Sequence, residues 1–154
     1  MIRPITPQDA PAVAVMVEKF VGLTQISGSL GFDGESSVSM LSMFGAHPAL
    51  FGFVAEDEDG IFGFIIASIT PFPWNQHRLV AQEMGWWVNP DRRGSTASVR
   101  LVAALEEEAW KRGAKAVLMI CEHGIKHEAV SKLYERRGYS SLEHLYVKEV
   151  PSWQ

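Results

Sequence analysis

The stretch that decides the fold is "WWVNPDRRGSTASVRL", residues 86–101, in which an apolar run gives way to a helical pattern. Arg92 and Arg93 stand at the junction, directly before a short run of glycine, serine and threonine. The first turn of a helix carries unpaired N–H groups and partial positive charge, so acidic or small polar residues are usual there. Two arginines at this point therefore predict that an anion binds.

A glycine-containing turn that opens a helix suits phosphate, because its N–H groups converge and the helix dipole favours negative charge. Guanidinium groups add charge and paired hydrogen bonds. Taken alone, the same short motif also describes an ordinary basic turn that caps a helix. A Walker-type nucleotide loop would need a Gly-Lys-Ser/Thr sequence, which the chain lacks. Phosphate binding and a simple cap both stay open at this point.

Strands and helices alternate along the chain, judged from apolar periodicity and from the positions of glycine and proline. They are expected at residues 1–6 (strand), 7–22 (helix), 35–47 (short helix), 49–56, 60–70 and 80–88 (strands), 95–112 (helix), 115–121 (strand), 128–138 (helix) and 142–150 (strand). The order β-α-α-β-β-β-α-β-α-β predicts an α/β fold in which helices cover a mixed sheet. We expect one domain over residues 1–154.

Local signals support several of these boundaries. Thr6 suits a helix N-cap and Pro7 the first helical position, and Gly113 suits a helix C-cap. The "DEDG" stretch at 57–60 predicts a hairpin turn through its Asp59-Gly60 pair, and the acidic residues 56–59 are interpreted as a solvated turn, with metal binding as the alternative. Residues 71–79 contain two prolines, which remove backbone donors, so we expect an irregular loop there.

Composition limits the class of protein. The chain has 154 residues, of which 47% are hydrophobic, enough for a buried core. A net charge of −4 argues against a nucleic-acid partner. The longest apolar run, residues 61–69, is too short to span a bilayer, and no signal peptide is recognisable. The single cysteine, Cys121, forms no internal disulfide, so we expect a cytoplasmic protein without a membrane partner.

The order of elements and two motifs resemble the GNAT superfamily of N-acetyltransferases over nearly the whole chain. In that family a strand precedes R-G-x-G-x-G/A at the start of a helix, and Val88, Pro90, Arg93, Gly94 and Leu101 match this pattern. The resemblance implies a GNAT-like, mostly antiparallel mixed sheet, a strand that splays before the loop, and acetyl-CoA as co-substrate, with its pyrophosphate on the loop. The implied coenzyme-binding residues are Trp87, Val88, Arg92, Arg93, Gly94, Ser95, Thr96, Ala97, Ser98 and His127.

The second motif is "VSKLYERRGY" at residues 130–139, which resembles the family's A-I-x-L-Y-E-K-x-G-F. The resemblance implies that Tyr134 protonates the departing thiolate. A free phenol has a pKa of about 10 and a free thiol one of about 8.5, so a thiolate leaving in water-poor surroundings gains from a nearby donor. Without the resemblance, Tyr134 is more typical of an amphipathic core residue. His127 stands where the family often has asparagine.

The implied reaction is direct transfer of an acetyl group to a primary amine through a tetrahedral intermediate, without a metal or a covalent enzyme intermediate. A base must take a proton from the amine. Glu83 is the first candidate, because it precedes Val88 on a strand where some family members carry a glutamate, and His77 is the second. His123 and His127 lie four residues apart, but no further ligand pattern accompanies them, so no metal site is predicted.

The acceptor is expected to be a small-molecule amine or an amine of a protein. Phe72, Trp74 and His77 are candidate acceptor-binding residues, although Phe72 and Trp74 suit equally well the anchors of a proline-rich loop. The family often pairs through its C-terminal strands, so the resemblance also allows a homodimer through "HLYVKEVPSW", residues 144–153.

Three departures from the family pattern, at Thr96, Ser98 and His127, keep a second function open. Thr96 and Ser98 stand where the family usually has glycine. Small hydroxyl side chains keep bulk low and donate hydrogen bonds, so they are compatible with a phosphate loop. The alternative is a catalytically weak protein of the same fold that serves as an acyl-CoA-binding or protein-interaction module.

Overall fold

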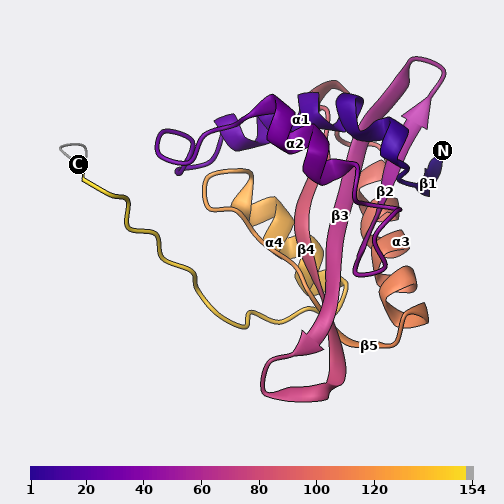
Figure 1. The fold of residues 1–154 in the computed structure, drawn as a ribbon, viewed down its shortest axis with the longest axis vertical. Coiled ribbons are helices and arrows are strands. Elements are labelled where there is room, and N and C mark those ends of the chain that lie inside the picture. The colour runs from indigo at the N-terminus through magenta and orange to yellow at the C-terminus, as the bar shows by residue number, and fades with distance from the viewer. Residues whose placement is uncertain (152–154) are drawn as a thin grey trace. The chain divides into compact units, whose positions relative to one another are not determined.

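The computed structural model describes residues 1–151 and contains one five-stranded sheet in the order β1-β2-β3-β4-β5 (Figure 1). The strands are β1 (Ile2–Pro4), β2 (Leu50–Asp57), β3 (Gly60–Phe72), β4 (Asn75–Val88) and β5 (Ala114–Leu118). The α-helices are α1 (Ala10–Gly22), α2 (Gly34–Leu41), α3 (Ala97–Lys111) and α4 (His127–Arg136), and the 3-10 turns are η1 (Pro7–Asp9) and η2 (Pro90–Arg92).

Neighbouring strands are antiparallel from β1 to β4, whereas β4 and β5 are parallel. The predicted mixed, mostly antiparallel sheet with flanking helices is therefore confirmed. Helix α3 packs against β2 and β3 (Figure 1). Leu101, Leu105 and Ala109, at steps of four on this helix, are fully buried, as the helical periodicity predicts. No helix within residues 1–151 combines the length and apolarity needed to cross a membrane.

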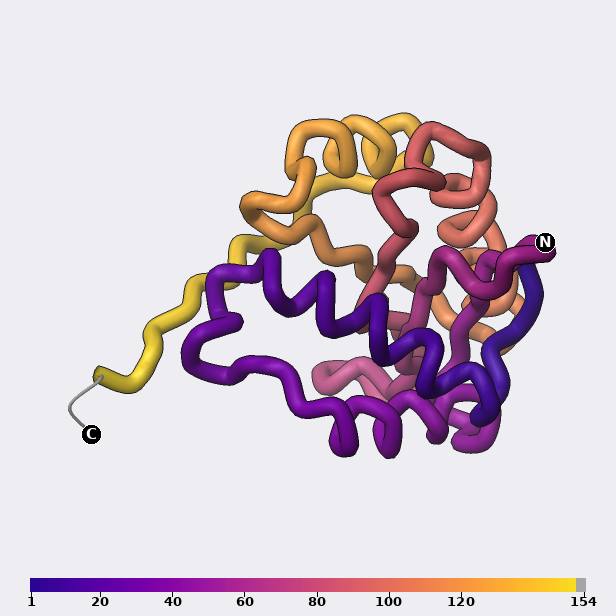
Figure 2. Tube along the Cα trace, turned by 90° about the horizontal axis from the view of Figure 1, so that it is seen from above, coloured from indigo at the N-terminus to yellow at the C-terminus, as the bar shows by residue number. Residues whose placement is uncertain are grey.

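The chain forms two compact units, each of which is described by itself. The first consists of Met1–Glu18 and Asp33–Ile120 and holds the whole sheet, α2 and α3. The second consists of Lys19–Phe32 and Cys121–Gln154 and holds the end of α1, most of the loop that follows it, and α4. Figure 2 traces the chain through α1, this loop and α2. The single domain expected from the sequence stays a prediction.

Local signals place several boundaries where the sequence predicts them. Thr6 is an N-cap, Pro7 is the first residue of η1, and the Asp9 carboxylate accepts hydrogen bonds from Thr6 N at 2.8 Å and Thr6 Oγ1 at 2.9 Å. Gly113 follows α3 with φ of +87°, a conformation that costs glycine little. The predicted turn at 57–60 joins β2 and β3 as an antiparallel hairpin.

The irregular loop predicted at residues 71–79 is wrong, because β3 and β4 cover all but two of these residues and form one long hairpin. Pro71 lies opposite Leu79 beside a register shift, and Pro73 lies in the turn. Gln76 Nε2 donates to the carbonyl oxygen of Pro73 at 3.2 Å and helps to close that turn. Proline is tolerated at such a strand end, where the ladder does not need its missing N–H.

The strand predicted at residues 142–150 is also wrong. Residues 139–151 are described and contain neither helix nor strand (Figure 1). Leu145 is 99% exposed and Tyr146 is 91% exposed. The apolar residues of this stretch express only a tendency to form a strand, whereas a strand itself requires a neighbour that supplies backbone hydrogen bonds. The observed order is therefore β-α-α-β-β-β-α-β-α.

Candidate functional site

Strand β4 leaves its parallel neighbour halfway along its length. Its pairing with β5 runs from Leu79 to Gln82 and ends there, while its pairing with β3 continues to Val88. The register of β3 against β4 shifts at the same level, between Ile66 and Ala67. A bulge of this kind bends a strand and re-aims its side chains. The second half of β4 therefore presents a backbone edge that β5 does not cover, as the family resemblance implies.

Glu83 lies where β4 and β5 part. The residue is only 4% exposed, and its Oε2 accepts a hydrogen bond from the backbone N–H of Ile120 at 3.0 Å. Ile120 follows the end of β5, so this hydrogen bond spans the gap between the two strands. The carboxylate predicted as the base is thus held beside the uncovered edge of β4 and away from bulk water.

Trp87 and Val88 end β4, and both are 5% exposed. The guanidinium carbon of Arg93 lies 4.4 Å from the centroid of the Trp87 ring, and Arg93 Nε donates to the carbonyl oxygen of Val88 at 2.9 Å. Trp87 Nε1 donates to Asn89 Oδ1 at 3.1 Å. Arg93 therefore folds back on the end of β4, and its two Nη groups make no hydrogen bond within residues 1–151.

The loop between β4 and α3 is exposed and rich in unbonded N–H groups. Gly94 adopts φ of +92°, where a side chain is rarely accommodated, and this conformation turns the chain toward the helix. Ser95 Oγ accepts a hydrogen bond from Ala97 N at 3.3 Å, but in the described part of the chain no acceptor faces the other N–H groups of the turn. These groups belong to Gly94, Thr96, Ser98 and Val99.

Such a loop is suited to an anion. The first turn of α3 contains no acidic residue, so the partial positive charge of the helix N-terminus is not neutralised there. A side chain at Gly94 would meet nothing within 4 Å, so the space beside the turn is open. Converging N–H donors, an open approach and the nearby Arg93 guanidinium are the features that phosphate groups require.

Arg92 has different surroundings from Arg93. Its Nη1 lies 2.7 Å from Asp57 Oδ2, its Nη2 lies 3.0 Å from Asp59 Oδ2, and its Nε lies 3.4 Å from Asp91 Oδ2. The charge of Asp57 and the hydrogen bond to Asp59 raise the pKa of the Arg92 guanidinium above its usual range. The acidic residues of the 57–60 turn, interpreted from the sequence as solvated, thus hold an arginine of the loop.

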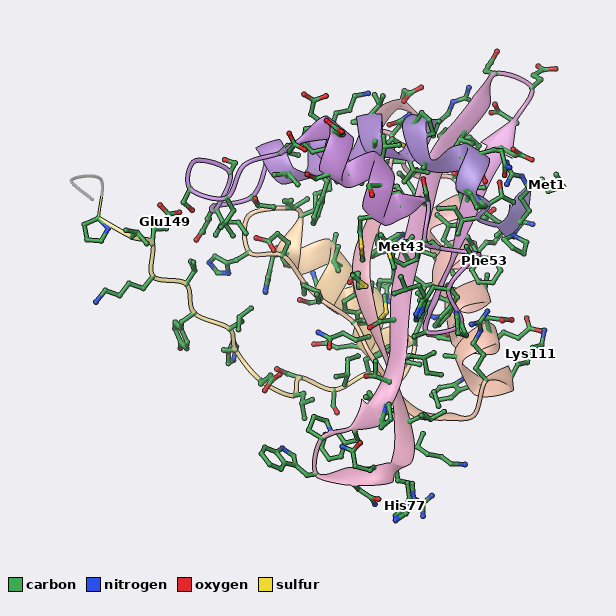
Figure 3. The ribbon with its side chains drawn as sticks, in the orientation of Figure 1. Met1, Met43, Phe53, His77, Lys111 and Glu149 are labelled. Carbon is green, nitrogen blue, oxygen red and sulfur yellow. The ribbon has the colours of Figure 1, made fainter. Side chains whose placement is uncertain are left out.

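The predicted acceptor-side residues lie at the other end of β4. Phe72 is 42% exposed and Trp74 is 88% exposed, and His77 lies on the outer part of the β3–β4 hairpin (Figure 3). At about 3.3 Å per residue, the strand from His77 to Val88 is about 35 Å long. The structure therefore does not bring these three side chains to the loop, and their contact with an acceptor stays a prediction.

The remaining predicted residues, His127 and Tyr134, belong to the second unit and lie on α4. Tyr134 is 7% exposed, and its ring centroid lies 5.5 Å from that of Tyr139. The ring of His127 lies edge-on to that of His123, with 5.4 Å between the centroids. No group of three histidine, cysteine or acidic residues able to hold a metal ion occurs within the described residues. The catalytic role of Tyr134 stays a prediction.

Comparison with known proteins bears directly on this loop and its sheet. The model of the acetyltransferase (GNAT) family matches residues 24–139. The chain belongs to this family. The resemblance drawn from residues 86–101 and 130–139 is confirmed, and the protein is an acetyltransferase.

Solved structures share the fold. A ribosomal-protein-alanine N-acetyltransferase from Brucella melitensis biovar Abortus 2308 has a TM-score of 0.69 at 18% identity, over 97% of this chain and 99% of that one. A GCN5-related N-acetyltransferase from Ralstonia eutropha JMP134 has a TM-score of 0.70 at 19% identity, over 96% and 97% of the two chains. AAC(6')-Iy, solved with the bisubstrate analogue CoA-S-monomethyl-acetylneamine, has a TM-score of 0.69 at 16% identity, over 98% and 97%. No curated protein matches the chain in sequence.

Sequence reasoning missed the residues that hold the loop in place. Asp57 and Arg92 are 35 residues apart in sequence, and the only signal for their contact is opposite charge, which many other pairs share. Nothing in the sequence marks Asn89 as part of the site, although its side chain accepts the hydrogen bond of the Trp87 indole. The sequence also gives no signal for the hydrogen bond from Ile120 N to Glu83, because this bond depends on how far β4 and β5 diverge.

Proposed function

We propose that the protein transfers an acetyl group from acetyl-CoA to a primary amine by direct attack, through a tetrahedral intermediate and without an acyl-enzyme. The observation that carries this proposal is the exposed turn at the start of α3, in which the N–H groups of Gly94, Thr96, Ser98 and Val99 have no acceptor among residues 1–151 and the neighbouring Arg93 keeps its Nη groups available. This donor set fits the pyrophosphate of a coenzyme A derivative. Bound there, acetyl-CoA supplies the activated acetyl group.

The residues of the loop have separate tasks in this proposal. The N–H groups of Gly94, Thr96 and Ser98, together with Ser95, Ala97 and Arg93, bind the phosphates. The backbone of Trp87 and Val88, on the edge of β4 that β5 leaves uncovered, holds the pantetheine arm and polarises the acetyl carbonyl. Arg92 belongs to the same loop, and His127 completes the predicted coenzyme contacts from α4.

Two side chains move protons in the proposed reaction. Glu83 takes the proton of the attacking amine, directly or through water, since its carboxylate is buried beside the uncovered part of β4. Tyr134 gives a proton to the departing thiolate, because a phenol is a suitable donor in a site from which water is excluded. Neither task requires a metal ion or a covalent bond to the enzyme.

The acceptor is an amine of a small molecule or of a protein. The names of the structural neighbours include both kinds, a ribosomal-protein-alanine acetyltransferase and an enzyme solved with an acetylneamine analogue. We place acceptor contacts at Phe72, Trp74 and His77 and expect a cytoplasmic location. A homodimer through residues 144–153 belongs to the same proposal, although Ser152 and Trp153 lie outside the described residues.

Calorimetric titration with acetyl-CoA tests this function. The wild-type protein should bind acetyl-CoA, and Arg93→Ala should weaken binding about tenfold or more, because charge-assisted hydrogen bonds to phosphate are lost. Arg78→Ala removes the same charge from an exposed position of the β3–β4 hairpin and should leave binding unchanged. Release of free thiol on adding amines then measures turnover. Absence of wild-type binding would contradict the proposal, and binding without thiol release from any amine would favour the catalytically weak module.

A further inference from the structure

Arg92 connects two segments of the first unit that are far apart in sequence. Its side chain leaves the loop and binds Asp57 and Asp59 on the β2–β3 turn, and its guanidinium carbon lies 5.4 Å from the centroid of the Phe62 ring. The N–H of Asp59 donates to Asp57 Oδ1 at 3.0 Å, so the turn itself orients the Asp57 carboxylate. Asn89 N also donates to the carbonyl oxygen of Phe62 at 2.8 Å, which ties the start of the loop to β3.

The backbone of Arg92 continues this connection toward the helix. Ser95 Oγ donates to the carbonyl oxygen of Arg92 at 2.9 Å, and the same Oγ accepts the hydrogen bond of Ala97 N at 3.3 Å. A continuous series of contacts therefore runs from the carboxylates of the β2–β3 turn, through Arg92 and Ser95, to the first residue of α3. Arg92 and Arg93 are adjacent, yet each Nη of Arg92 donates to a carboxylate, whereas neither Nη of Arg93 has an acceptor in the described chain.

We infer that Arg92 is a positioning residue, which sets coenzyme affinity by fixing the loop to Asp57 and Asp59 rather than by binding phosphate. This inference rests on the proposed function, because it concerns affinity for the coenzyme. The guanidinium already faces three carboxylates, and binding a phosphate directly would require it to leave them. The benefit of the contact is preorganisation, since a loop held in its binding conformation loses less entropy when a ligand arrives.

The two possible roles of Arg92 predict opposite signs for one substitution. If Arg92 positions the loop, Asp57→Asn loosens the loop and weakens coenzyme binding. If Arg92 binds phosphate directly, Asp57→Asn releases the arginine from a competing carboxylate and strengthens binding. Glu58→Gln is the matched control, because Glu58 belongs to the same exposed turn, carries the same charge and makes no ion pair within residues 1–151.

The first measurement is the dissociation constant of coenzyme A for wild type, Asp57→Asn, Glu58→Gln and Arg92→Lys, by calorimetry at low salt. Relative to Glu58→Gln, Asp57→Asn should weaken binding about threefold, as expected for a partly exposed ion pair, and 0.5 M salt should reduce this difference. Arg92→Lys keeps the charge but not the two-pronged geometry, so it should lie between Asp57→Asn and wild type. In turnover with a reactive amine, KM for acetyl-CoA should rise and kcat should not change.

The second measurement needs no coenzyme. Hydrogen exchange of the peptide spanning residues 90–98 should be faster in Asp57→Asn than in Glu58→Gln, while exchange in α3 beyond residue 101 stays the same. Equal exchange and equal affinity in the two variants would overturn the inference, and so would tighter binding by Asp57→Asn. If the wild-type protein binds no coenzyme at all, the proposed function fails, whereas the exchange measurement still decides whether the turn holds the loop.

Discussion

Two arginines of the first unit each hold a pair of carboxylates, but in different surroundings. Arg3 binds Asp9 through two hydrogen bonds of 2.8 and 2.9 Å and Glu56 through two of 2.8 Å. The Asp9 side chain is 10% exposed and that of Glu56 is 22% exposed. Arg92 binds Asp57, which is 30% exposed, and Asp59, which is 77% exposed. Neighbouring residues of one strand, Glu56 and Asp57, thus serve different arginines.

Similar ion pairs therefore have different effects at the two places: one set stabilises the fold and the other holds a loop. Arg3 joins β1, the start of the first helix and the end of β2, and hydrogen bonding to it lowers the pKa of Asp9 to about 2. The ion pairs of Arg3 therefore stabilise the fold. Arg92 lies at the surface, where water and salt screen its charge, so its pairs contribute little to global stability. Its place beside the exposed turn of α3 gives it influence on that loop instead.

The largest expected effect concerns Glu83, a buried carboxylate outside both arginine clusters. Glu83→Gln should lower kcat about a hundredfold, since loss of a general base costs that order of rate. The fall in rate at acidic pH, caused by protonation of the base, should disappear in this variant. Stability should change little, because the glutamine oxygen can still accept the hydrogen bond from Ile120 N. Glu58→Gln, the same change at an exposed position of the β2–β3 turn, is the control, and an unchanged pH–rate profile in Glu83→Gln would remove Glu83 as the base.

The next effect concerns the ion pairs that Arg3 makes with Asp9 and Glu56. Because the pKa of Asp9 is lowered to about 2 from 3.8, its stabilisation is complete above about pH 4 and is lost as pH falls toward 2. Asp9→Asn should therefore cost about 2 kcal/mol near pH 7 and flatten the loss of stability between pH 4 and 2. Urea unfolding at several pH values measures this. Glu107→Gln, which removes an exposed helical pair with Lys111, should cost much less than Asp9→Asn, because water screens the pair.

The smallest effect distinguishes the ion pairs of Arg92 from those of Arg3. Asp57→Asn should reduce the free energy of unfolding by less than about 1 kcal/mol, because its ion pair with Arg92 is partly exposed. The same urea experiment measures it beside Asp9→Asn. A loss equal to that of Asp9→Asn would show that the two arginine clusters brace the fold alike, and the contrast between them would fail.

The sequence predicts those parts of the molecule that depend on nearby residues. Thr6 and Pro7 mark the start of the first helix, and the Asp-Gly pair of the 57–60 turn marks a hairpin. Apolar spacing in 95–112 identifies the buried face of α3. Each of these signals acts within about one turn of helix or one hairpin, so its physical cause is complete in the local sequence.

Predictions fail where the outcome depends on a distant partner. The prolines of 71–79 suggested a loop, but β3 and β4 pair across them, since register with a long neighbour outweighs a local preference. The apolar residues of 142–150 favour a strand, but no neighbouring strand pairs with them in the described chain. For the site, the motif predicts a loop with two arginines at the start of α3, and anion binding there stays a prediction. The motif does not show that Arg92 faces three carboxylates while Arg93 folds back on Trp87.

The sequence by itself determined the family, the order of most elements and the position of the loop at the start of α3, because a glycine turn, a capping residue and a repeating apolar face express local backbone and burial preferences. Only the tertiary structure decided where β4 leaves β5, where the Glu83 carboxylate lies and which acid each arginine meets. Those features are contacts between segments tens of residues apart. Charge and hydrogen-bonding capacity make many such contacts feasible, and the packing of the sheet selects among them.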